Sequence, residues 1–280
     1  MRRLVLTVVM LGAMSGAQAA DLSDLPILRG AFTEGLTTSR VNWQGYYIGG
    51  QAGYGSSDEN FNGSTSTMIA ALLANTTIES EMGVSRWNLG LGKQSARTSA
   101  FGGFAGHNWQ WEDVVIGLEG SYLHGAFGGL TSATKSLVGS SPLSDGFFHA
   151  VRATSLSAIE ITDIATLRAR GAYAYGSFLP YMFAGLAFGN ANITRSVSVD
   201  DHYGTTFASA VASCSIAFCA ALNSSQVQHN HLVYGYSAGL GIDINLVGGL
   251  FMRAEWEYLR FSASTDTSIN TVRAGLGYKF

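Results

Sequence analysis

The sequence predicts an all-β fold: a transmembrane antiparallel up-and-down β-barrel of about eight strands with long extracellular loops. Three observations predict it. Apolar and polar residues alternate along a series of short segments, long and short connections alternate between these segments, and the composition is apolar with few charges. Hydrophobic residues make up 47% of the chain and charged residues 12%, whereas a typical soluble domain has about 25% charged residues. The net charge of −3 favours no nucleic-acid partner.

The alternation is clearest in the third expected segment. Val114, Ile116 and Leu118 share one parity, and Glu119 falls on the other, which is the period of two typical of a β-strand. The second segment is rich in glycine, and its facing is ambiguous. The expected strands lie around residues 46–55, 98–109, 114–122, 165–173, 182–188, 234–243, 252–258 and 272–280.

The alternation also predicts which face meets lipid. Aromatic residues gather at the strand ends, as in the interfacial girdles of membrane barrels. Apart from strand ends such as Arg260, the charges within these segments lie opposite the apolar row. A soluble β-sandwich, with its apolar face inward, is the rival fold.

The charged row is therefore expected inside the barrel. Because an eight-stranded barrel is just wide enough for side chains to fill, these charges are expected to pair as a buried network. The alternative is a small or gated channel with the same charges as its selectivity filter. The expected lumen residues are Glu119, Arg168, Arg170, Arg253, Glu255, Glu257 and Arg273.

Connection lengths support the barrel. Long connections are expected at 56–96, 125–158 and 190–228, and short ones at 110–113, 176–179 and 245–248. The last outer loop, 262–268, is brief. Short periplasmic turns and longer extracellular loops are typical of membrane barrels. The long loops are expected to carry short helices or strand extensions, with a helical turn at 68–75.

The first 19 residues are expected to be a cleaved signal peptide. Two arginines precede an apolar stretch of about 11 residues, too short to cross a bilayer as a helix. Ala17-Gln18-Ala19 has the small-x-small pattern that signal peptidase reads. Cleavage is expected after Ala19, with Ala20 as the alternative site; a buried N-terminal helix is the other interpretation. Residues 20–42 are then a periplasmic lead-in, and residues 43–280 form the barrel.

Cys214 and Cys219 are the only cysteines and lie close together in one expected loop. Export into an oxidising compartment favours a local disulfide between them, and a reduced pair is the alternative. The sequence offers no convincing set of further zinc ligands, so neither a metal nor a cofactor is expected.

Histidines and serines raise two other possibilities. His229 and His231 are expected on one strand face near the outer rim, where imidazoles can bind haem or a metal; ordinary rim polarity is the alternative. Catalysis on lipids would need a nucleophile, a base and an acid together. No such set converges in the sequence, so the chain is not expected to be an enzyme.

The last strand ends on an aromatic residue. Leu276, Tyr278 and Phe280 alternate with other residues up to the C-terminus, a pattern that resembles the insertion signal of outer-membrane barrels. Strand pairing is a known mode of such recognition. The expected partners are outer-membrane lipids and lipopolysaccharide, the barrel assembly machinery and periplasmic chaperones.

Several motifs carry a family resemblance. The stretches 43–50 (WQGYYIGG), 167–173 (LRARGAY), 253–258 (RAEWEY) and 272–280 (VRAGLGYKF) resemble the small porin-family surface barrels of alphaproteobacteria. The resemblance implies an eight-stranded, OmpA-like surface antigen in the outer membrane of a Gram-negative cell. Some relatives are described as porins and others as haemin-binding antigens.

The expected function is that of a structural outer-membrane surface protein whose extracellular loops are available for contact. A small-solute porin is the alternative, and a haem-binding surface protein is a third possibility.

Overall fold

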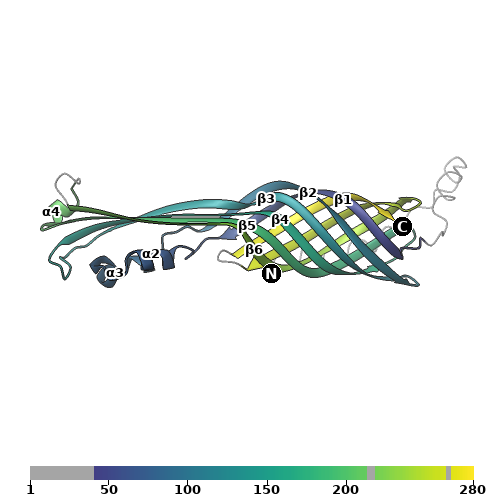
Figure 1. Cartoon of the computed structure of the whole chain (residues 1–280), viewed down its shortest axis with the longest axis horizontal. Coiled ribbons are helices and arrows are strands. Elements are labelled where there is room, and N and C mark those ends of the chain that lie inside the picture. Colours follow the sequence, from purple (N-terminus) through teal and green to yellow (C-terminus); the bar gives the residue numbers. More distant parts are fainter. Residues whose placement is uncertain (1–40, 213–217, 263–265) are drawn as a thin grey trace, which may run out of the picture. The chain divides into compact units, whose positions relative to one another are not determined.

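The computed structural model describes residues 41–212, 218–262 and 266–280. Eight antiparallel strands follow one another around a closed barrel in chain order (Figure 1). The strands are β1 (Gly45–Asn60), β2 (Lys93–Trp111), β3 (Val114–Val138), β4 (Phe148–Tyr173), β5 (Phe178–Gly204), β6 (Phe218–Val247), β7 (Leu250–Ser262) and β8 (Asp266–Lys279). The predicted fold class is confirmed.

Direct pairing of the first and last strands closes the barrel. Tyr47 lies opposite Lys279, and the ladder between β1 and β8 continues as far as Asn60. A closed barrel has no free strand edge. At one end the strands are joined by tight turns, and Glu112, Gly176 and Gly248 in these turns have φ between 54° and 58°. This end is called the turn end below.

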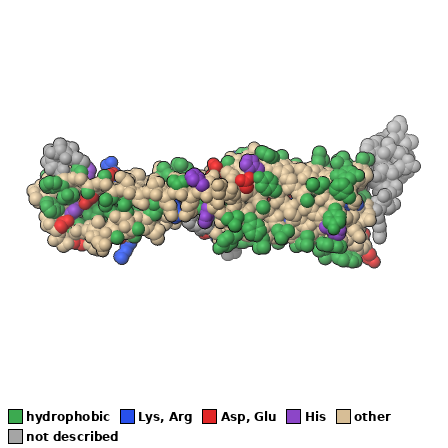
Figure 2. All heavy atoms as spheres, viewed as in Figure 1, with side chains coloured by type: hydrophobic (Ala, Val, Ile, Leu, Met, Phe, Trp, Pro, Cys, Tyr) green, Lys and Arg blue, Asp and Glu red, His purple; other side chains and the backbone are tan. Residues whose placement is uncertain are grey.

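The exterior of the barrel is apolar. Leu118 is 51% exposed, whereas its neighbour Glu119 is 1% exposed, so adjacent residues face opposite sides of the wall. Hydrophobic side chains gather over the barrel part of the face in Figure 2. The outward-facing row is called the apolar belt. It lies on residues 46–54, 101–111, 114–122, 165–173, 178–188, 232–246, 250–258 and 272–280.

Four strands continue beyond the barrel. The β2–β3 ladder ends where Phe101 meets His124, and the β6–β7 ladder ends where Tyr234 meets Ser262. The ladders joining β3, β4, β5 and β6 run on to their tips (Figure 1). The extension is called the long sheet. It comprises residues 127–138, 148–161, 193–204 and 218–228.

The long sheet confirms the strand extensions that were one of the two expectations for the long loops. Most of 125–158 and 190–228 is regular strand rather than irregular loop. The apolar alternation is weak there because serine, threonine and alanine occupy many positions on both faces. These residues pair through the backbone without giving the hydrophobic signal of a half-buried strand.

The β1–β2 connection is helical and packs on the inner face of the long sheet. It forms α2 (Ser66–Leu72), α3 (Thr77–Met82) and the 3-10 turn η2 (Val84–Arg86); α2 confirms the helical turn predicted near residue 68. Ile69 and Leu73 join a buried cluster with valines of β4 and β5. One further helix of the described residues, α4 (Phe207–Ala210), lies at the tip of the β5–β6 hairpin.

Within the described residues, no helix is long and apolar enough to cross a membrane. The predicted signal peptide, with its cleavage site after Ala19, and nearly all of the predicted lead-in lie outside the described residues.

Candidate functional site

The seven predicted lumen residues all lie inside the barrel. Each is buried to 3% exposure or less. They reach the interior because each has the inward parity of its strand, opposite the apolar belt. Salt bridges join all seven, and Asp243 is an eighth member of the same network.

Glu119 is the centre of the network. It forms ion pairs with Arg168, with Arg170 at 3.2 Å and with Arg253 at 2.9 Å. It also accepts a hydrogen bond of 2.7 Å from the Tyr47 hydroxyl. One carboxylate on β3 therefore connects strands β1, β4 and β7 across the barrel axis.

The other carboxylates distribute the remaining charge. Asp243 lies 2.7 Å from Arg170 and 2.8 Å from Arg253. Arg273 lies 3.0 Å from Glu255 and 2.7 Å from Glu257. Four arginines thus face four carboxylates, so the network is neutral in sum. Neutrality matters because an uncompensated buried charge costs several kcal/mol.

Asp243 was missing from the predicted lumen set although its parity pointed inward. It stands between two isoleucines near the end of its expected strand, where an acidic residue is easily assigned to the turn. The signal that identifies it is the arginine count, because the predicted set held four arginines and only three acids.

Aromatic rings pack between the charges. The guanidinium of Arg170 lies 3.8 Å from the ring centre of Tyr181, and that of Arg253 lies 3.9 Å from the ring centre of Phe104. Arg168 lies 4.2 Å from the ring centre of Phe183. Cation–π contact is strongest where water is excluded, as it is here. The rings leave little room for solvent beside the ions.

Glycines make room for these rings. Tyr181 lies directly opposite Gly241, and Phe183 lies opposite Gly239. A Cβ added to either glycine would collide with the facing ring. The same pairing of ring and glycine recurs around the barrel, at Tyr47 with Gly106, Phe104 with Gly49, and Phe251 with Gly277.

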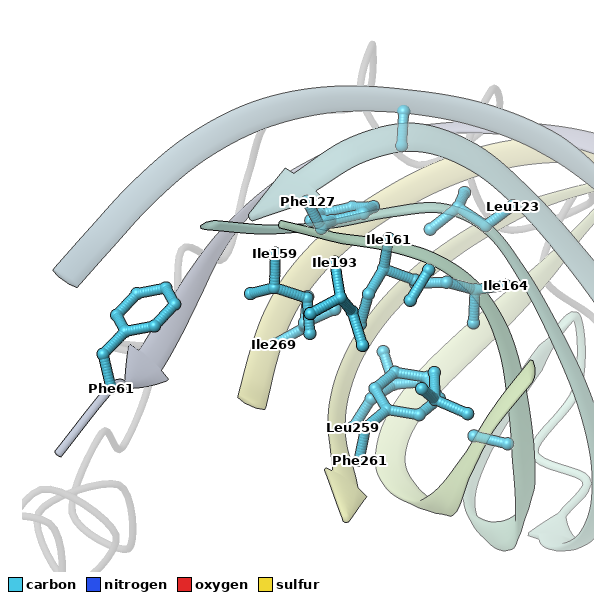
Figure 3. Packing of buried hydrophobic residues seen from close by; sticks show 14 of the residues in the cluster. Phe61, Leu123, Phe127, Ile159, Ile161, Ile164, Ile193, Leu259, Phe261 and Ile269 are labelled. Atoms are coloured by element: carbon cyan, nitrogen blue, oxygen red, sulfur yellow. The ribbon is translucent and has the colours of Figure 1, made fainter. Parts of the chain in front are cut away.

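Hydrophobic side chains fill the barrel on both sides of the charged layer. Toward the long sheet, Phe127, Ile161, Phe261 and Ile269 belong to one buried cluster (Figure 3). At the turn end, Trp43 packs with Phe251 and other rings. The interior is therefore a stack of apolar, charged and apolar layers.

The last predicted set, Leu276, Tyr278 and Phe280, faces outward. The three side chains are between 50% and 74% exposed, and Phe280 donates its backbone N–H to the Tyr46 carbonyl at 2.9 Å. Their recognition by an assembly machine stays a prediction. Cys219 lies near the start of β6 and Cys214 lies outside the described residues, so their disulfide also stays a prediction.

The two candidate haem-binding histidines do not share a face. Gln228 pairs with Ile193 and His231 pairs with Ala191, with a register shift between them. Asn230, in this irregular stretch, has φ of 53°. An extra residue in a strand reverses the facing of the side chains on one side of it relative to the other. His231 therefore has the inward parity of the neighbouring β6 residues, and His229 has the opposite parity. The prediction that they line one face was wrong. Within the described residues, no cluster of three or more potential metal ligands occurs.

Comparison with known proteins decides the family. A model of the outer membrane protein beta-barrel domain matches residues 5–280. The chain belongs to the outer-membrane β-barrel protein family. The barrel therefore lies in the outer membrane, and the apolar belt faces its lipids.

A curated relative agrees with this assignment. The 25 kDa outer-membrane immunogenic protein of Brucella ovis is 26% identical over 202 residues, which cover 69% of this chain and 74% of that protein. Two solved structures are similar at 13% identity, each over 84% of this chain. They are Ail, the attachment invasion locus protein of Yersinia pestis, with a TM-score of 0.32 and 99% of its chain covered, and Neisserial surface protein A, with 0.35 and 97%.

Proposed function

We propose that this outer-membrane barrel is a surface contact protein. In this proposal the long sheet stands outside the cell and binds external molecules, and the barrel anchors it without conducting solutes. The observation that carries the proposal is the length of β3, β4, β5 and β6, which have 25 to 30 residues each. A strand needs only about 9–11 residues to cross a bilayer.

The filled lumen supports contact over transport. A porin keeps a water-filled channel, whereas here an apolar cluster and a charged layer follow one another along the axis. Opening a path would require separating ion pairs in a region of low dielectric, which is costly. The small-solute porin is therefore the weaker candidate. His229 and His231 do not share a face, so they do not support haem binding as a pair of ligands.

Conductance tests the sealed barrel. The purified chain, inserted into planar bilayers, is expected to give no steady unitary steps, and a general porin in the same detergent is the positive control. Steady steps that change when Arg168 and Glu255 are both neutralised would establish transport and overturn this half of the proposal.

Labelling of intact cells tests the orientation. In a C214S/C219S background, Ser198→Cys on the outer face of the long sheet is expected to react with a membrane-impermeant maleimide. Gly176→Cys in a tight turn is the matched control, expected to react only after the cells are opened. Labelling of the turn and protection of the sheet would reverse the assigned orientation.

The strand register allows the contact surface to be removed. Leu130 pairs with Ala158, and Thr194 pairs with Val227, so both hairpins are shortened by joining these pairs through two-residue turns. The shortened barrel is expected to keep its heat-modifiable migration on gels. Cells carrying it are expected to adhere less to immobilised extracellular-matrix protein than cells with the full chain. Equal adhesion would contradict the proposed contact role.

A further inference from the structure

A cavity of about 380 Å³ lies near the tip of the long sheet. Its floor is the inner face of β4, β5 and β6, and the connection between α2 and α3 forms one wall. The rings of Phe147 and Tyr203 line it together with the apolar side chains of Ile78 and Leu222. This volume is within the range of small-ligand pockets, about 300–1,000 Å³.

A buried histidine lies between two carboxylates in this cavity. His149 is 4% exposed. Its Nδ1 lies 2.9 Å from Asp201, and its Nε2 lies 3.0 Å from Asp145. A neutral imidazole donates from only one nitrogen, whereas an imidazolium donates from both. When both carboxylates are ionised, the three groups together carry one net negative charge even with His149 protonated.

Two carboxylates are the charged groups of the cavity besides His149, and the uncharged polar side chains of its lining are Asn75, Thr76 and Thr77. The Asp145 side chain is 33% exposed and the Asp201 side chain 12% exposed. A carboxylate offers about four lone-pair sites, so both keep acceptor capacity beyond the histidine. Beside the cavity, Glu81 accepts a hydrogen bond from the backbone N–H of Ser144, the neighbour of Asp145. Among the described residues that line the cavity, none is a lysine or an arginine.

The aromatic wall is held in place by stacking. The Tyr203 ring lies between those of His149 and Phe218, at 5.5 Å from each and inclined by 21° to each. The Phe147 ring meets Tyr203 edge-on at 5.6 Å. Because these contacts fix the rings before any ligand arrives, little side-chain entropy is lost on binding.

We propose that this cavity binds a small organic cation, an ammonium or guanidinium group carried on an apolar body. The carboxylates supply charge and acceptors for the cationic head, and the aromatic rings favour a cation over a neutral group of the same size. The apolar wall receives the rest of the molecule. An anion would be repelled by the carboxylates of Asp145 and Asp201.

Binding of three matched probes tests the proposal. The full chain in phosphatidylcholine nanodiscs is titrated with phenethylamine, 2-phenylethanol and phenylacetate, which share one ring and differ in charge. Shifts of the Phe147 and Tyr203 ring signals in NMR spectra are the readout, so partition into lipid does not count as binding. The amine is expected to bind at least tenfold more tightly than the alcohol, and the acid is expected not to bind.

Two substitutions complete the design. Asp145→Asn keeps the acceptor for the Phe147 backbone N–H and is expected to weaken amine binding at least tenfold. Asp200→Asn is the matched control, because it changes the neighbour of Asp201 on the opposite face of β5. It is expected to change the affinity less than twofold.

Three results would each overturn the cation site: no shift with the amine, equal affinity for the alcohol, or the same loss from both substitutions. The experiment needs neither a surface orientation nor a sealed lumen. Its failure would therefore leave the proposed contact function standing.

Discussion

Glu119 connects side chains of three other strands inside this barrel. Its carboxylate faces three arginines and the Tyr47 hydroxyl while being 1% exposed. Glu119→Gln would keep the shape of the side chain but leave the arginines with one positive charge in excess. Removing one partner of a buried ion pair costs about 3–5 kcal/mol.

We therefore expect Glu119→Gln to lower the free energy of unfolding by an amount of that order. Urea unfolding in lipid bilayers, followed by tryptophan fluorescence, would measure it. Glu160→Gln on the exposed face of β4 is the matched control and is expected to stay within about 0.5 kcal/mol of wild type. A similar small effect at Glu119 would mean that the network is hydrated rather than sealed.

Inward glycines are a second feature at the residue scale. A Cβ at Gly241 would collide with the Tyr181 ring, whereas nothing lies within 4 Å of a Cβ at Gly171 on the outer face. Gly241→Ala is expected to destabilise the barrel by about 1–3 kcal/mol through overpacking. Gly171→Ala is expected to be neutral or slightly stabilising. Equal unfolding midpoints for the two variants would show that the interior has room to spare.

Glu59 gives the fold a pH dependence. It lies beyond the apolar belt, is 1% exposed, and no arginine or lysine of the described residues pairs with it. Burial raises the pKa of its carboxyl above the usual 4.5. The folded state therefore holds this proton more tightly than the unfolded state, and stability falls as the pH rises from the usual pKa through the raised one.

Replacing Glu59 with Gln removes this penalty. Glu59→Gln is expected to be more stable than wild type at pH 8, and the difference is expected to disappear near pH 4, where both states of the wild type are largely protonated. Paired unfolding curves at the two pH values would show it. A constant difference between the two proteins at both pH values would exclude titration as its cause.

At the scale of elements, β3 carries two environments along one strand. Leu118 and Leu130 are 51% and 61% exposed, yet the first lies in the apolar belt and the second on the long sheet. Leu118→Arg is expected to cost about 2–4 kcal/mol, as a cation near the middle of a bilayer does. Leu130→Arg is expected to cost less than about 0.5 kcal/mol. Equal costs, measured by refolding into lipid vesicles, would contradict the position of the membrane boundary.

The strands that cross the membrane could be predicted from the sequence, whereas the extent and pairing of the long sheet could not. Lipid on one side and packed side chains on the other impose a strict alternation, as at Val114 to Tyr122. Beyond the belt, serine, threonine and alanine occupy many positions on both faces, so stretches such as 154–158 (TSLSA) look like loop in the sequence. Residue types alone do not show which residues of two segments pair. These segments are strands because their backbones pair in a defined register.

Some residues of the candidate sites could likewise be predicted from the sequence, and others could not. Inward parity was enough to place Glu119, Arg168 and Arg253 in the lumen, because period two assigns a face without further information. The pairing of Tyr181 with Gly241 could not be predicted, because it depends on the register between β5 and β6. The cavity at His149 needed four separate segments of the chain to meet, and no local pattern indicates such a meeting. His229 and His231 were misplaced because one extra residue in the strand reverses the facing.

At the scale of the whole molecule, the chain joins a barrel with an apolar exterior to a sheet with an apolar inner face. In the barrel, the apolar side chains face outward and the ions lie along the axis. In the long sheet, the helices of the β1–β2 connection cover an apolar inner face, as in a water-soluble domain. The two arrangements meet at the apolar cluster around Phe127 and Phe261, which seals one from the other.

Site-directed spin labelling tests this division most directly. In a C214S/C219S background, labels at Leu118, Leu186 and Leu240 are compared with labels at Leu130 and Ser198 in lipid bilayers. The first three are predicted to collide with dissolved oxygen far more than with a water-soluble nickel chelate, and the last two to show the opposite preference. Nickel access at the first three sites together with oxygen preference at the last two would contradict the inverted barrel and the position of its boundary.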